Sequence, residues 1–190
     1  MGKTAAKKAP PLDREAWIRT ALEALAEHGA DSLRIEVLAR RCGVTKGSFY
    51  WHFKDRRDLI DALLDTWKRG RLDDIRKQTR ADPGQELAAI YHTIDVYAAA
   101  KNRKGLLIET AVRQLARYDA AAAATVEEVD TTRLACSENL FRGCGLPAQE
   151  AKARSLLLYA YVFGQSLMHY EHYASDVGEL RRWIVEHIAR

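Results

Sequence analysis

Hydrophobic residues recur along this chain at intervals of three and four, which is the spacing of one face of an α-helix. The first such stripe starts after Asp13, a good N-cap residue, and stops before Gly29, which can end a helix in the left-handed conformation. Its members are Ile18, Leu22, Leu25 and Ala26. The pattern therefore predicts a first helix between these two end signals.

Three further helices are expected at short intervals. A second stripe ends at Gly43, and Thr45 can cap the helix that follows. That third helix carries Phe49 and Phe53 one turn apart as its inward face. Asp55 can cap a fourth helix, whose apolar face includes Leu59, Leu63 and Trp67. Two short helices around a glycine turn, flanked by two longer ones, indicate a compact helix-turn-helix bundle.

The rest of the chain repeats the helical spacing. Breaks fall at Asp82-Pro83-Gly84 and between Gly143 and Pro147, and no window alternates strictly between apolar and polar residues. A helix is expected after Gly84, on the stripe Leu87, Ile90, Ile94 and Tyr97. We expect the later helices at 105–118, 120–141, 147–173 and 177–190. The sequence thus predicts an all-α fold of about nine helices.

The expected helix 147–173 is apolar on more than one side. Such a helix must be covered on two sides. In a chain of 190 residues, we expect another subunit to cover the second side. This pattern favours a homodimer.

Charge is distributed unevenly along the chain. The first 57 residues hold 12 Lys/Arg against 7 Asp/Glu, whereas the remainder holds 18 against 19. A basic end on a neutral body is typical of proteins that bind a polyanion. Residues 1–10 are expected to form a disordered basic tail, which either reaches the DNA or is simply solvated.

Other classes of protein receive little support. The three cysteines form no CxxC pair and have no His at zinc-finger spacing, so we expect no metal site and no cofactor. No secretion signal and no run of about 20 apolar residues occurs, so we expect a cytoplasmic protein without membrane contact. No nucleophile motif, Glu-x-x-His pair or phosphate-binding loop suggests an enzyme.

Residues 38–53, LARRCGVTKGSFYWHF, closely resemble the signature of the TetR family of bacterial transcriptional regulators, and the resemblance continues through KDRRDL at 54–59. It implies a DNA-binding domain at 11–71 with its helix-turn-helix at 34–53. It also implies an effector-binding and dimerisation domain at 72–190.

A recognition helix presents small side chains to base edges and basic or hydroxyl groups to phosphates. Gly47 would allow close approach, Lys46 could read guanine, and Tyr50 and His52 resemble phosphate-binding positions of the family. Tyr50 and Trp51 have a competing interpretation as packing residues against the fourth helix. The full predicted DNA-binding set is Arg34, Thr45, Lys46, Gly47, Ser48, Tyr50, Trp51, His52, Lys54 and Arg56.

Two positions depart from the family pattern. Arg34 stands where many members have a Ser or Thr cap, and it can instead meet a phosphate. Glu36 stands where a basic residue is common. We predict no DNA contact for Glu36, because a carboxylate would repel a nearby phosphate.

The resemblance also implies an effector pocket within the C-terminal helices and dimerisation through the last two long ones. Aromatic and polar residues available to a pocket are Trp67, Tyr91, His92, Arg113, Tyr118 and Phe141, although each can equally be core or, for Arg113, a surface partner of Glu109. The predicted dimer contacts are Leu156, Ala160, Phe163, Gly164, Leu167, Trp183, Ile184 and Ile188.

The function implied is sequence-specific binding of double-stranded operator DNA by a homodimeric repressor, released by an unknown small-molecule effector. The alternative is a DNA-binding regulator without a small-molecule switch, controlled by a protein partner or by its abundance.

Overall fold

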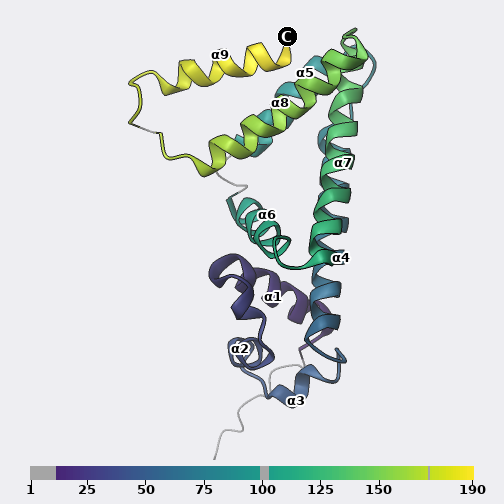
Figure 1. Cartoon of the computed structure of the whole chain (residues 1–190), viewed down its shortest axis with the longest axis vertical. Helices are drawn as coiled ribbons and strands as arrows, with labels where there is room; N and C mark the ends of the chain where they lie inside the picture. The colour runs from purple at the N-terminus through teal and green to yellow at the C-terminus, as the bar shows by residue number, and fades with distance from the viewer. Residues whose placement is uncertain (1–11, 99–102, 171) are drawn as a thin grey trace, which may run out of the picture. The chain divides into compact units, whose positions relative to one another are not determined.

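The computed structural model describes residues 12–98, 103–170 and 172–190, and these residues form helices without any β-strand (Figure 1). The predicted all-α fold is confirmed. The helices, with one 3₁₀ turn labelled η1, are α1 (Arg14–His28), η1 (Ala30–Leu33), α2 (Ile35–Arg41), α3 (Lys46–Phe49), α4 (Arg56–Gln78), α5 (Glu86–Ala98), α6 (Arg103–Leu115), α7 (Ala120–Gly143), α8 (Ala148–Leu167) and α9 (Val177–Ala189). The predicted tail at 1–10 lies outside the described residues.

The chain divides into two compact units, Met1–Thr66 and Trp67–Arg190. This boundary and the boundary predicted after residue 71 both fall within α4.

The first unit is built around the aromatic ring of Trp17. This side chain is fully buried, and Ile18 and Leu25 of the same helix face are buried beside it. Leu38 of α2 and Leu63 of α4 are also without exposed surface. Of the stripe predicted for the first helix, Ile18 and Leu25 are buried, whereas Leu22 and Ala26 are half-buried. The core face is completed by residues that the stripe left out, namely Trp17, Ala21 and Ala24.

The Asp13 carboxylate accepts a hydrogen bond from the backbone N–H of Ala16 at 2.7 Å, and this bond caps α1. Asp13→Ala is expected to lower the free energy of unfolding by about 1 kcal/mol, because one N–H of the first turn loses its acceptor. Urea denaturation followed by circular dichroism measures the change. Asp13→Asn retains an acceptor and should stay close to the parent, so equal losses for the two variants would contradict the capping role.

The second unit packs α5, α7, α8 and α9 around one core. Ile90 and Ile94 of α5 meet Phe141 of α7 and Leu158 of α8 there, all of them buried. Ile188 closes the core from α9. Phe141 and Ile188 are thus core residues rather than parts of a pocket or an open face.

The helix predicted over 147–173 ends earlier, at Leu167. Met168 adopts an extended backbone (φ −90°, ψ 142°), so the chain leaves the helical path and turns back toward α9. The Tyr170 hydroxyl then accepts a hydrogen bond from Arg181 Nε of α9 at 2.9 Å. The prediction of a helix to residue 173 was therefore wrong beyond Leu167, where the backbone leaves the helical conformation.

Candidate nucleic-acid interface

The short helix α3 is anchored by one aromatic side chain. Phe49 is fully buried, and its ring lies edge-on to Trp17 with centroids 5.5 Å apart. Phe53 stacks on Phe49 at 5.2 Å, and Tyr50 meets the same ring edge-on at 5.4 Å. Because α3 has only four helical residues, these contacts and not its own hydrogen bonds hold it in place.

The turn before α3 is a Schellman motif. The Gly43 N–H donates to the Arg40 carbonyl at 3.1 Å, and the Val44 N–H donates to the Ala39 carbonyl at 3.0 Å. Gly43 has a φ of +67°, which only glycine adopts without strain. The turn directs Thr45 and α3 away from α2 at a fixed angle.

The outward side of α3 is open. Tyr50 is 52% exposed and Trp51 is 87% exposed, so Trp51 does not pack against α4 as the alternative interpretation proposed. The Thr45 side chain makes no capping bond, which leaves its hydroxyl available. A Cβ built on Gly47 would meet only Thr45 Oγ1, at 3.7 Å. The fold therefore does not require glycine at position 47.

Lys46 and Glu36 form an ion pair that the sequence analysis missed. The hydrogen bond from Lys46 lowers the pKa of Glu36, and the same bond raises the pKa of Lys46. Both groups stay charged at neutral pH, so the Lys46 ammonium already has an anionic neighbour. The sequence held one signal for this pair, an acidic residue in the first turn of α2 where a basic one is common.

Two of the predicted arginines bond to the backbone of their own domain. The Arg56 guanidinium donates to the carbonyls of Leu33, at 3.1 Å, and Ala30, at 3.3 Å. Arg34 Nε donates to the Asp31 carbonyl at 3.1 Å. Both hold η1, which sequence reasoning did not foresee, and both side chains remain exposed.

The other predicted positions lie close to α3. Lys54 is exposed, and its backbone N–H donates to Asp58 Oδ2 at 2.9 Å at the start of α4. Ser48 and His52 are half-buried on the flank of the aromatic anchor. The predicted residues 45–52 therefore lie on one short segment that includes α3. Lys54 and Arg56 follow this segment closely in the sequence, whereas Arg34 stands before α2.

The six predicted pocket residues do not share a cavity. Tyr91 lines one cavity and Arg113 another, while Trp67 and Phe141 are buried and His92 and Tyr118 are exposed. Arg113 forms more than a surface pair, since it donates to Glu109 at 2.8 Å and to Asp130 at 2.6 Å.

The eight predicted dimer residues fall into three groups. Leu156, Leu167 and Trp183 are exposed, with 61%, 65% and 61% of their surfaces accessible. Ile188 belongs to the core, and Phe163 is half-buried beside Tyr97. The remaining three line a cavity between α8 and α9, and they are Ala160, Gly164 and Ile184.

Residues 18–63 match the family model described as "Bacterial regulatory proteins, tetR family". The chain is 52% identical over 54 residues to the tetracycline repressor protein class C of Escherichia coli, a match that covers 28% of this chain and 25% of that protein. It is 29% identical over 99 residues to the transcriptional regulator AcrR of Shigella flexneri, covering 50% of this chain and 46% of that one. The chain thus spans between a quarter and a half of the length of these curated relatives.

The fold match is more extensive. A crystal structure of a transcriptional regulator from Streptomyces coelicolor A3(2) aligns with a TM-score of 0.70 at 18% identity, covering 93% of this chain and 96% of that one. The first unit, with its anchored α3 behind a glycine turn, is a helix-turn-helix DNA-binding domain. Its residues 18–63 carry the DNA-binding domain of the TetR family of bacterial regulatory proteins, which confirms the resemblance noted in the sequence.

Within the described ranges, none of the helices combines the length and the apolar character needed to cross a bilayer.

Proposed function

We propose that this protein is a homodimeric repressor that binds a palindromic operator through α3 of each subunit and leaves it when a small-molecule effector binds. The DNA-binding part of this proposal is supported by the open surface of α3. Its anchor, Phe49, is fully buried, whereas Tyr50 and Trp51 project outward beside an unobstructed Gly47. Such a helix, held firmly from behind and free in front, suits insertion into a major groove.

Selection of bound sequences from random DNA tests this proposal. We expect an inverted repeat whose half-sites lie about one helical turn, roughly 34 Å, apart. Footprinting at moderate salt should then protect both half-sites together. Enrichment of no sequence, or of a single unrepeated half-site, would contradict the palindromic operator.

The Lys46–Glu36 pair leads to a prediction about affinity. Glu36→Gln is expected to tighten operator binding several-fold, because it removes a carboxylate near the phosphates and frees the Lys46 ammonium. The slope of log affinity against log salt should steepen by about one, the contribution of one added phosphate contact.

Fluorescence anisotropy over a salt series measures both effects. Glu15→Gln makes the same charge change at an exposed position of α1 and serves as the control. If Glu36→Gln bound no more tightly than Glu15→Gln, the ion pair would have no bearing on DNA binding.

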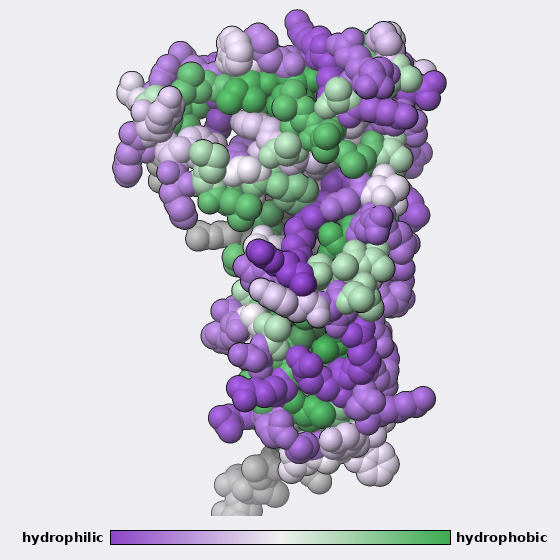
Figure 2. Space-filling model, viewed as in Figure 1, coloured by the Kyte–Doolittle hydropathy of each residue, from purple (hydrophilic) through white to green (hydrophobic). Residues whose placement is uncertain are grey.

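Dimerisation is proposed from exposed apolar side chains on the last two helices. Leu156 and Leu167 of α8 and Trp183 of α9 are each more than half exposed, and Figure 2 shows hydrophobic residues gathered along these helices. Exposed patches of this kind mark interaction surfaces.

Leu156→Glu is therefore expected to shift the protein toward monomer in sedimentation-velocity experiments, because a charge would be buried in the interface. Leu107→Glu changes a leucine of α6 that is 51% exposed and should leave the assembly intact. A monomeric parent protein, or an unchanged Leu156→Glu dimer, would rule out this surface.

Effector release is proposed by the following linkage. A ligand that prefers one arrangement of the dimer lowers DNA affinity by the factor by which DNA lowers ligand affinity. Titration of the operator with and without the ligand, and titration of the ligand with and without the operator, should therefore change the two affinities by the same factor.

A further inference from the structure

The helices α8 and α9 converge at one end and separate toward the loop that joins them (Figure 1). Near their point of convergence, Arg154 of α8 donates to the Ile188 carbonyl of α9 at 3.3 Å. Toward the loop, the space between the helices is a cavity of about 440 Å³. This volume lies in the range of natural ligand pockets, roughly 300–1,000 Å³.

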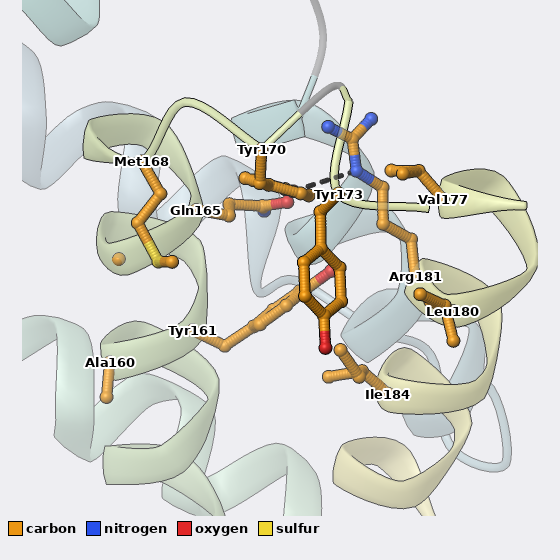
Figure 3. Close-up of a pocket in the computed structure, with 11 residues that line it drawn as sticks. Ala160, Tyr161, Gln165, Met168, Tyr170, Tyr173, Val177, Leu180, Arg181 and Ile184 are labelled. Atoms are coloured by element: carbon orange, nitrogen blue, oxygen red, sulfur yellow. Dashed lines mark hydrogen bonds between the residues drawn. The ribbon is translucent and has the colours of Figure 1, made fainter. Parts of the chain in front are cut away.

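The walls of this cavity are almost wholly apolar. Ala160, Gly164 and Met168 line it from the α8 side, and Val177, Leu180 and Ile184 line it from α9. Figure 3 shows the rings of Tyr161 and Tyr173 extending into the space between the two helices. A Cβ built on Gly164 would meet no atom within 4 Å, so the cavity continues up to the α8 backbone.

Three side chains with polar ends stand along one side of this otherwise apolar cavity. Tyr161, Gln165 and Arg181 line both this cavity and a neighbouring one of about 290 Å³, so these three side chains form the boundary between the two. The Gln165 Nε2 is buried and has no hydrogen-bond acceptor among the described residues. A buried amide donor without an acceptor is costly, and a ligand oxygen would satisfy it.

Arg181 is held at this boundary by Tyr170. Its Nε donates to the Tyr170 hydroxyl at 2.9 Å (the dashed line in Figure 3), and its guanidinium carbon lies 5.0 Å from the centre of the Tyr170 ring. The terminal nitrogens are not used in that bond. The boundary therefore combines an amide, a phenol and a guanidinium held by one hydrogen bond, whereas the acidic side chains of Asp95 and Glu186 line the neighbouring cavity.

We infer that the cavity between α8 and α9 binds an amphipathic monocarboxylate, with its apolar body among the walls and its carboxylate at Gln165 and Arg181. A guanidinium and an amide donor together match a carboxylate in charge and in hydrogen bonding. A cationic ligand would meet the positive charge of Arg181 at the boundary, and a polyol would leave its hydroxyls unpaired against the apolar walls. This ligand class would be the effector of the repressor proposed above, and its regulatory role rests on that proposed function. Binding of the ligand to the cavity does not itself require DNA.

Calorimetric titration of the full chain with decanoate tests the inference. Decanol, which has the same chain length but no carboxylate, serves as the comparison. We expect saturable binding of one decanoate per chain and at least tenfold weaker binding of decanol. Gln165→Leu and Arg181→Leu should each weaken decanoate at least tenfold and leave decanol unchanged. Gly164→Leu should abolish binding of both, because its side chain fills the cavity.

Gly70→Leu is the matched control for Gly164→Leu. Gly70 is an exposed helical glycine of α4 whose Cβ would also meet no atom within 4 Å. Circular dichroism and sedimentation accompany each titration, so that lost binding is separated from lost folding. Gly70→Leu should bind decanoate as the parent does.

Equal affinity for decanoate and decanol would overturn the carboxylate assignment. Undiminished decanoate binding by Gly164→Leu would overturn the site. If the parent bound no decanoate and the Gly164→Leu variant lost its dimer, the ligand proposal would be wrong and the cavity would instead be occupied by a second copy of the chain. These titrations contain no DNA, so a failed operator experiment leaves their result intact, and their failure leaves operator binding untouched.

Discussion

Glu109→Leu is expected to lower the free energy of unfolding by about 3 kcal/mol, because it removes the main counter-charge of the buried Arg133 and leaves it only the partly exposed Asp130, at 2.9 Å. Glu109 is 2% exposed and Arg133 is 1% exposed. The Arg133 guanidinium donates to both Glu109 carboxylate oxygens, at 3.2 and 3.3 Å. Burial by itself would lower the pKa of Arg133, but the nearby Glu109 charge raises it, so the guanidinium remains ionised.

Aromatic rings enclose the same guanidinium. The Arg133 guanidinium carbon lies 5.0 Å from the ring centre of Phe163 and 5.4 Å from that of Tyr159. These rings exclude water from the ion pair, so the solvent cannot replace a missing carboxylate.

Urea denaturation followed by circular dichroism measures the loss. Glu109→Leu/Arg133→Leu removes both charges and leaves Arg113 paired with Asp130, so it should recover most of the lost stability. Glu179→Leu breaks the exposed pair with Arg182 and should cost less than about 1 kcal/mol. A Glu109→Leu protein as stable as Glu179→Leu would show that the buried pair has no special role.

Gly47→Leu is expected to reduce operator affinity to the non-specific level, on the order of a thousandfold. The bulky side chain would stand on the open side of α3, where the DNA would approach. Stability should be unchanged or slightly higher, because a Cβ at this position meets only Thr45 Oγ1, at 3.7 Å, and leucine favours helix over glycine.

Anisotropy titration with the selected operator measures the loss of affinity, and thermal denaturation checks the fold. Gly70→Leu makes the same change on the exposed side of α4 and should bind the operator normally. Tight operator binding by Gly47→Leu would mean that α3 does not enter the groove through position 47.

The sequence predicted the parts of the fold that depend on local pattern. Phe49 and Phe53, one turn apart, identified the inward face of α3, and Gly43 identified the turn before it. Contacts between distant residues were not predictable in this way. The pairing of Lys46 with Glu36 and the bond from Arg56 to the Leu33 carbonyl both depend on how α2, α3 and η1 meet in space.

The C-terminal unit was predicted as a set of helices but not as a site. Its helical spacing gave the elements, whereas the end of α8 at Leu167 has no glycine or proline at 168–173 to signal it. Ala160, Gly164 and Leu156 of α8 were all assigned to a dimer surface. Periodicity does not distinguish a side chain that lines a cavity from one that covers a partner, so Ala160 and Gly164 could not be separated from Leu156.

The four tryptophans are divided between the two units in a way that suits optical measurement. Trp17 and Trp67 are buried, whereas Trp51 on the outward side of the recognition segment and Trp183 on α9 are exposed. Each unit therefore has one indole that a dissolved quencher can reach and one that it cannot. In a Trp183→Phe variant, a loss of quenching would report that the surface around Trp51 has become covered. In a Trp51→Phe variant, it would report the same for the surface around Trp183.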